Sequence, residues 1–254
     1  MIEARRVSKE FNRRKKVVAL ENLDLKVGNN EFVSIIGPSG CGKSTFLLMV
    51  AGLESLTSGE ILCDREAVTG PDPKRAIVFQ EYLLFPWQTV RKNIEFGPRV
   101  KGVPADERKK ISNHYIGLVG LDGFENQYPH ELSGGMKQRV AIARALANNP
   151  AVLLMDEPFG ALDALTREML QTELLRIWQK ARCTVLFVTH SISEAVFLSD
   201  RVVIMSSRPG RIISDIRIDL PRPRSRETLF SPEFKEYEKA MREIIWNEVN
   251  MDSY

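Results

Sequence analysis

One glycine-rich octapeptide constrains the fold of this chain more than any other feature. It consists of Gly37, Pro38, Ser39, Gly40, Cys41, Gly42, Lys43 and Ser44. An apolar run at residues 32–36 precedes it, and Phe46, Leu47 and Val50 follow at the spacing of one helix face. This order predicts a buried strand that passes through a tight loop directly into a helix.

The pattern G-x-x-x-x-G-K-[ST] in that setting is typical of a phosphate-binding loop. Glycines let successive backbone N–H groups turn inward around a polyanion, and the start of the helix adds partial positive charge. Lys43 is expected to reach the β- and γ-phosphates of a nucleotide, and Ser44 offers a hard oxygen ligand to Mg²⁺. Thr45 is the last residue of this segment that is expected to contact the nucleotide. A tight turn without a ligand is the alternative.

Two carboxylates follow another buried strand. The apolar run at residues 152–155 ends in Asp156 and Glu157. Acids delivered by a buried strand beside the loop of a neighbouring strand suit Mg²⁺ binding. We expect Asp156 to hold the metal through water and Glu157 to orient or deprotonate an attacking water. In isolation, Asp-Glu-Pro is also compatible with a simple helix-starting turn.

Strands alternate with helices along most of the chain, which predicts an α/β fold. Buried strands are expected at residues 76–79, 184–188 and 201–205, and residues 23–27 alternate like a strand with one solvated face. A mostly helical insertion is expected at about residues 88–148. The sheet is therefore expected to be mainly parallel and wrapped by helices.

The last part of the chain, residues 221–254, is expected to be a linker and a helix. Pro221 and Pro223 mark a break, and Ser231 with Pro232 supplies an N-cap and a first-turn proline. The apolar residues that recur at helical spacing are Phe234, Tyr237, Met241, Ile244 and Ile245. Packing on the rest of the domain and contact with a partner both remain open for this face.

Composition limits the other functions open to the chain. It has 254 residues, 43% of them hydrophobic, and a net charge of +3 without a Lys/Arg stripe, which argues against a nucleic-acid partner. Two short basic clusters, residues 13–16 and 222–226, are expected to be solvated loops. No apolar run approaches the roughly 20 residues of a membrane span, so any membrane role is expected to come through a partner.

The three cysteines are Cys41, Cys63 and Cys183. They lack a CxxC spacing, which indicates neither a disulfide framework nor a zinc site and fits a reducing cytosol. Cys41 lies inside the predicted phosphate loop. We expect a thiol reagent to inhibit the protein and ATP to protect it.

A second glycine-bearing helix start lies downstream, in the segment LSGGMKQR at residues 132–139. Combined with the phosphate loop, this segment closely resembles the signature of ABC transporter ATPases. The resemblance implies a P-loop NTPase core with an antiparallel β subdomain and a helical subdomain, spanning about residues 1–220. It also implies that Ser133, Gly134, Gly135 and Gln138 contact ATP.

The other elements of that family follow in order. Gln80 resembles the glutamine that senses Mg²⁺ and the γ-phosphate, and it is expected to join Ser44 and Asp156 at the metal. His190 resembles the switch histidine that contacts the γ-phosphate, and residues 161–163 resemble the loop that crosses the dimer interface. Phe11 lies where the family has an aromatic residue that stacks on adenine, although a buried core phenylalanine is the alternative. The resemblance therefore implies Glu157, His190, Gln80 and Lys43 as the catalytic set.

In this family two copies of the chain lie head to tail and bind two ATP molecules between them. The resemblance therefore implies a homodimer, bound to transmembrane permease subunits at the cytoplasmic face of the membrane. The loop from Gln80 to Trp87 is expected to receive a helix of the permease, with Phe85, Pro86 and Trp87 as the walls of the groove. Buried packing within the domain is the alternative for this loop.

Several longer segments narrow the resemblance to import ATPases of the nitrate, sulfonate and taurine group. They are LFPWQTV at residues 84–90, DEPFGALD at 156–163, EAVFLSD at 194–200 and SSRPGR at 206–211. Such importers receive cargo from a separate binding protein. One rival is a soluble ABC ATPase acting on nucleic acid or in translation, and another is a regulatory module that binds ATP without hydrolysing it.

Overall fold

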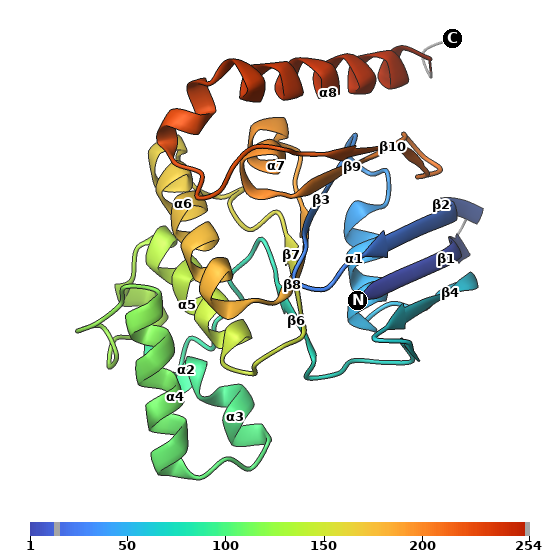
Figure 1. Cartoon of the computed structure of the whole chain (residues 1–254). Coiled ribbons are helices and arrows are strands. Elements are labelled where there is room, and N and C mark those ends of the chain that lie inside the picture. Colours follow the sequence, from blue (N-terminus) through green and yellow to red (C-terminus); the bar gives the residue numbers. More distant parts are fainter. Residues whose placement is uncertain (13–15, 252–254) are drawn as a thin grey trace. The chain divides into compact units, whose positions relative to one another are not determined.

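The computed structural model describes residues 1–12 and 16–251. The chain forms two compact units, one made of Met1–Asp72 and Thr184–Tyr254, the other of Pro73–Cys183. Figure 1 labels most of their helices and strands. Most of the predicted basic cluster at residues 13–16 lies outside the described residues. No helix among those described is long and apolar enough to cross a bilayer.

The first unit begins with an antiparallel sheet. Its strands are β1 (Ile2–Asn12), β2 (Lys16–Val27), β4 (Ser58–Cys63) and β5 (Glu66–Ala67), in the order β2-β1-β4-β5. Leu23, Leu25 and Val27 are buried while Asp24 and Lys26 are exposed. The predicted alternation with one solvated face is therefore confirmed, and the sheet supplies the expected antiparallel β subdomain.

The same unit contains parallel strands that carry the predicted loop. The strand β3 (Phe32–Ile36) lies between β8 (Thr184–Val188) and β9 (Arg201–Met205), parallel to both, and β10 (Ile212–Arg217) pairs antiparallel with β9. All five residues of β3 are buried, as its unbroken apolar run predicts. The helices α1 (Lys43–Ala51) and α7 (Ile192–Leu198) belong to this unit.

The second unit pairs two parallel strands, β6 (Arg75–Val78) and β7 (Val152–Asp156). Between them in the chain come α2 (Val90–Ile94), α3 (Phe96–Val100), α4 (Ala105–Leu118), a 3-10 turn (Pro129–Glu131) and α5 (Gly134–Leu146). After β7 comes the long helix α6 (Ala164–Ala181). Strands alternating with helices in both units confirm the predicted α/β class.

The tail is part of the first unit. A 3-10 turn (Arg226–Phe230) leads into α8 (Pro232–Met251), which contacts α7 and runs beside it in Figure 1. The N–H of Phe234 donates to the Ser231 hydroxyl at 3.2 Å, which confirms the predicted N-cap. Phe234 and Met241 are completely buried. The apolar face thus packs on its own domain at these two positions.

The basic cluster at residues 222–226 is not a solvated loop, so that prediction is wrong. Arg224 is buried and donates to the carbonyls of Val196, Phe197 and Ser199 at 2.7–3.0 Å. Arg222 pairs with Asp200 and donates to the Leu198 carbonyl at 2.7 Å. The end of a helix leaves its last carbonyls without partners within the helix, and at α7 these two guanidinium groups provide the donors.

Candidate nucleotide-binding site

The phosphate loop joins β3 to α1 as predicted. Gly40 and Gly42 have φ angles of 76° and 105°, in the left-handed region that side chains disfavour. A Cβ atom at Gly42 would lie 2.7 Å from the Leu20 side chain and 3.0 Å from the Ala19 carbonyl oxygen. Only glycine fits there, so β2 holds the loop tightly against the start of α1.

Lys43 points back across this loop. Its Nζ donates to the carbonyls of Gly37 at 2.9 Å and Pro38 at 2.8 Å, and the residue is only 6% exposed. The ammonium group is thus positioned by the loop itself. Ser44 is exposed at the first turn of α1, and Thr45 is half-buried. Backbone donors, a cation held by the loop and a helix start without a side-chain cap fit the demands of a polyphosphate.

Cys41 is completely buried. Its sulfur lies 3.7 Å from the Lys43 Nζ, beneath the loop. The expectation that a thiol reagent reaches this residue is therefore not supported, because the reagent must contact the sulfur to react. The backbone of Cys41 remains part of the loop.

His190 lies at the same edge of the sheet as the phosphate loop. In the parallel pairing of β3 with β8, Ile35 is opposite Val188, and the Thr189 N–H donates to the Ile35 carbonyl at 3.2 Å. His190 follows directly and is exposed. Phe11, at the end of β1, is partly exposed under the Lys9 ammonium at 4.9 Å, so it is not the buried core residue of the alternative interpretation.

The second unit brings Gln80 together with the turn after Glu157. Val78 is opposite Met155 in the pairing of β6 with β7, so Gln80 and the two acids follow adjacent strand ends. A Cβ at Gly160 would lie 2.9 Å from the Gln80 amide nitrogen. Glu157 has φ 45°, a left-handed backbone that is uncommon outside glycine and is concentrated at functional sites.

The predicted signature begins α5. Met136 donates its N–H to the Ser133 hydroxyl at 3.3 Å, so Ser133 is an N-cap. Gly134 and Gly135 lie against Tyr82 and Thr166, at 3.1 and 3.0 Å from the positions their Cβ atoms would take. Gln138 differs from the other three signature residues, because its side chain is completely buried. Its amide nitrogen and oxygen are buried and have no hydrogen-bond partner among the described residues.

The loop from Gln80 to Trp87 is largely exposed. Trp87 is 71% and Leu83 53% exposed, so complete burial of this loop within the domain is wrong. Phe85 is half-buried, with its ring 4.5 Å from that of Phe96. The unpredicted residue here is Arg144 of α5, which donates to the Leu83 carbonyl at 2.6 Å and the Tyr82 carbonyl at 3.1 Å. Nothing in the local sequence pattern indicates that long-range contact.

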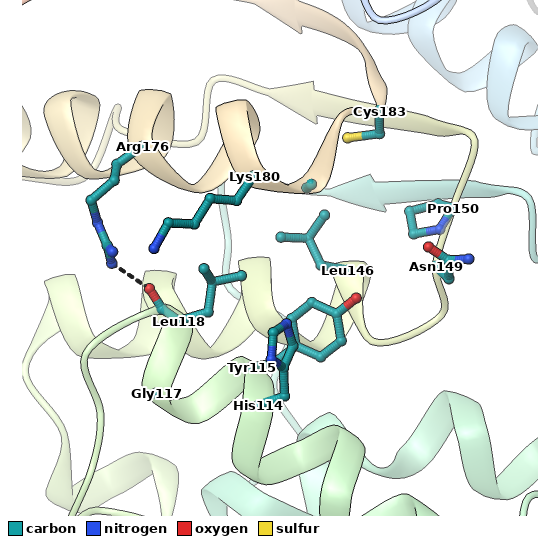
Figure 2. Close-up of a pocket in the computed structure, with 11 residues that line it drawn as sticks. His114, Tyr115, Gly117, Leu118, Leu146, Asn149, Pro150, Arg176, Lys180 and Cys183 are labelled. Carbon is teal, nitrogen blue, oxygen red and sulfur yellow. Dashed lines mark hydrogen bonds between the residues drawn. The ribbon is translucent and has the colours of Figure 1, made fainter. Parts of the chain in front are cut away.

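A cavity of about 500 Å³ in the second unit lies outside the predicted site (Figure 2). His114 and Tyr115 of α4 face Arg176 and Lys180 of α6 across it, and Arg176 donates to the Leu118 carbonyl at 2.5 Å. None of the residues lining it is a predicted nucleotide or metal contact. The candidate site therefore rests on the loops at the strand ends, not on this cavity.

Comparison with known proteins assigns the family. A family model described as ABC transporter matches residues 20–160, which include the phosphate loop, the signature and both carboxylates. The chain belongs to the ABC transporter family. Members of this family are ATP-binding cassettes, and this chain is an ABC-type ATPase.

Individual ABC relatives match almost the whole chain. The aliphatic sulfonates import ATP-binding protein SsuB of Bacillus cereus is 50% identical over 92% of this chain and 92% of its own. The nitrate import ATP-binding protein NrtD of Synechocystis is 48% identical over 92% and 90%. The ATP-binding cassette MJ0796, solved as a dimer in a post-hydrolysis state with ADP and Pi, is 33% identical, with a TM-score of 0.75 over 87% of this chain and 100% of that one.

Proposed function

We propose that this ABC ATPase energises an importer of a small oxyanion such as a sulfonate, taurine or nitrate. The observation that carries the proposal is the identity of about half of the aligned residues, over 92% of the chain, with proteins named for nitrate and sulfonate import. Cargo selection itself is expected to lie in a separate binding protein and in permease subunits. The chain contributes the ATPase.

ATP suits the phosphate loop because the left-handed glycines Gly40 and Gly42 allow the backbone to turn around phosphates, and Lys43 holds a cation within the loop. Mg²⁺ would be held by the Ser44 hydroxyl, Gln80 and Asp156, with nucleotide phosphates completing the shell, as is usual for this ion. Among the described residues, no cluster of three or more His, Cys, Asp or Glu side chains could hold a metal without such help. When bound, Mg²⁺ neutralises charge on the phosphates.

Hydrolysis requires a positioned water and charge stabilisation more than covalent chemistry. Glu157 is proposed to orient or deprotonate the water, and its left-handed backbone is of a kind that is concentrated at functional sites. Gln80 and His190 are proposed to sense the γ-phosphate. Phe11, partly exposed at the end of β1, is available to stack on a base.

Two copies are proposed to form two complete sites, each joining the phosphate loop of one copy to Ser133, Gly134 and Gly135 of the other. Met169 of α6 supports this assembly, because it is well exposed and lines the same surface hollow as Ser133 and Gly135. The loop from Gln80 to Trp87 would bind the permease at the cytoplasmic face of the membrane. Exposed aromatic side chains are typical anchors of such contacts.

Uptake in whole cells tests the proposal. A strain lacking this gene should lose uptake of one labelled oxyanion among taurine, an alkanesulfonate and nitrate, and the wild-type gene should restore it. The Lys43→Ala gene should not restore it, since ATP binding or hydrolysis would be lost. Unchanged uptake of all three anions in the deletion strain would refute the proposed cargo class. Salt-sensitive nucleic-acid binding by the purified protein would instead favour the rival function.

A further inference from the structure

The turn between β9 and β10 contacts the phosphate loop although nothing in the predicted site includes it. Arg208, in this turn, donates to the Gly40 carbonyl oxygen through Nη2 at 2.8 Å and through Nε at 3.2 Å. The turn and the phosphate loop are 168 residues apart in sequence and belong to the same compact unit. No other acceptor for Arg208 is present among the described residues.

The turn itself is held firmly in place. The Ser206 hydroxyl accepts the Arg211 N–H at 2.9 Å and donates to the Pro209 carbonyl at 3.0 Å. Gly210 donates to the Ala19 carbonyl at 3.0 Å, and its own carbonyl accepts the Glu21 N–H at 3.1 Å. The turn is thus bonded to β2, the same strand that packs against Gly42. Arg208 therefore extends from a fixed support.

The Gly40 carbonyl belongs to the peptide that supplies the Cys41 N–H. A trans peptide places its oxygen and its hydrogen on opposite sides, so a donor that fixes one direction fixes the other. The Cys41 N–H makes only a long bond of 3.4 Å, to the Pro38 carbonyl within the loop. It is therefore a donor that a stronger acceptor, such as a phosphate oxygen, would take over.

We infer that Arg208 is a positioning residue for ATP, acting through the Gly40–Cys41 peptide. It anchors the carbonyl on the outer side of the loop and so keeps the Cys41 N–H directed at the phosphates. Its positive charge also polarises that peptide and favours an anion in the loop. The inference rests on the proposed role of residues 37–44 as the phosphate site.

The expected effect is on affinity for the nucleotide. The loop binds phosphates before and during hydrolysis. A loop that holds phosphates less tightly therefore loses binding energy that is common to the ground and transition states. Arg208→Ala should raise both the dissociation constant and the KM for ATP about tenfold while kcat stays within about twofold. Arg208→Lys keeps the charge but not the paired donors, and its dissociation constant should fall between those of Arg208→Ala and wild type.

Calorimetric titration with MgATP, at a temperature where every variant is folded, measures the binding. The melting temperature without nucleotide should be unchanged in Arg208→Ala, whereas its rise on adding a fixed ATP concentration should be smaller than in wild type. Arg217→Ala is the matched control, because Arg217 is an exposed arginine of the same hairpin, and Asp219 is its one ion-pair partner among the described residues. It should behave like wild type in both measurements.

An ATP dissociation constant in Arg208→Ala equal to that of wild type would overturn the inference, whatever happens to the melting temperature. A tenfold rise that Arg217→Ala shows as well would also overturn it, because the effect would then be one of net charge. Lys43→Ala, measured in parallel, separates this outcome from failure of the phosphate site. If Lys43→Ala also binds ATP as wild type does, the proposed phosphate site is wrong. If Lys43→Ala has lost ATP binding while Arg208→Ala has not, only the role inferred for Arg208 is wrong.

Discussion

Single residues of this protein are fixed by contacts with distant parts of the chain. Gly210 is an example, because a Cβ atom there would lie 2.1 Å from the Cys41 carbonyl oxygen. Glu157 is another, since a glutamate holds a backbone conformation more usual for glycine. At Gly210 the neighbouring loop excludes any side chain, whereas at Glu157 a side chain is kept despite the unfavourable backbone.

The three cysteines lead to a prediction at the scale of single residues. All three are buried, and burial raises the pKa of Cys183 to about 11, so almost no thiolate forms there near pH 8. When a chromogenic disulfide reagent is added to the native protein, almost no thiol should react over minutes. In protein unfolded in urea, all three thiols should react. Fast labelling of Cys41 in the native protein would show that the phosphate loop opens readily.

At the scale of elements, helix ends and strand ends organise the molecule. The strands β3 and β8 place the phosphate loop and His190 at one edge, and β6 and β7 place Gln80 beside the turn after Glu157. The end of α7 depends on a segment far along the chain, because Arg222 and Arg224 bond its last carbonyls. Arg224 is only 4% exposed, and this burial lowers the pKa of its guanidinium group to about 10.

Arg224→Ala should therefore destabilise the protein. It leaves buried carbonyls of α7 without donors, a change expected to cost roughly 2–4 kcal/mol. Urea unfolding followed by circular dichroism would measure the free energy of unfolding. Arg217→Ala is the control, since this arginine is 83% exposed and its loss leaves no buried group unpaired. Equal midpoints for Arg224→Ala and wild type would contradict this account of the tail.

The loop from Gln80 to Trp87 leads to a second prediction for an element. Trp87→Ala should lower transport about tenfold or more, because exposed aromatic anchors dominate small interfaces. Its melting temperature should not change, since the side chain is largely in solvent. Trp246→Ala tests whether any exposed tryptophan matters, because Trp246 of α8 is 69% exposed. Transport equal to wild type in Trp87→Ala would exclude this residue from the proposed groove.

The whole molecule is proposed to work as a pair of copies that ATP closes and hydrolysis opens. ATP shifts that equilibrium only if it binds the closed state better. A variant that binds ATP but does not hydrolyse it should therefore remain closed.

Glu157→Gln should bind ATP, lower kcat about 10²–10⁴-fold and accumulate as a dimer with MgATP, as light scattering would report. The control is Glu243→Gln, which removes an equal charge from the exposed surface of α8. Monomeric Glu157→Gln at saturating MgATP would argue against the proposed assembly. Substantial remaining hydrolysis would argue against Glu157 as the base.

The sequence by itself determined the parallel strands, the glycine-rich loop that follows the first of them, and the α/β class. These features depend on local order: unbroken apolar runs at residues 32–36 and 184–188, glycines at the turn, and a helix pattern directly after Lys43. Periodicity and turn chemistry act over a few residues, so one sequence is enough to recognise them.

Only the tertiary structure decided which distant groups meet. The burial of Arg224, the exposure of Trp87, the burial of Cys41 and the bond from Arg208 to Gly40 all join or separate segments far apart in the chain. A basic or aromatic residue has the same letter whether it is solvated, buried or anchoring a loop. Its surroundings are set by packing, and packing depends on the whole fold rather than on neighbours in sequence.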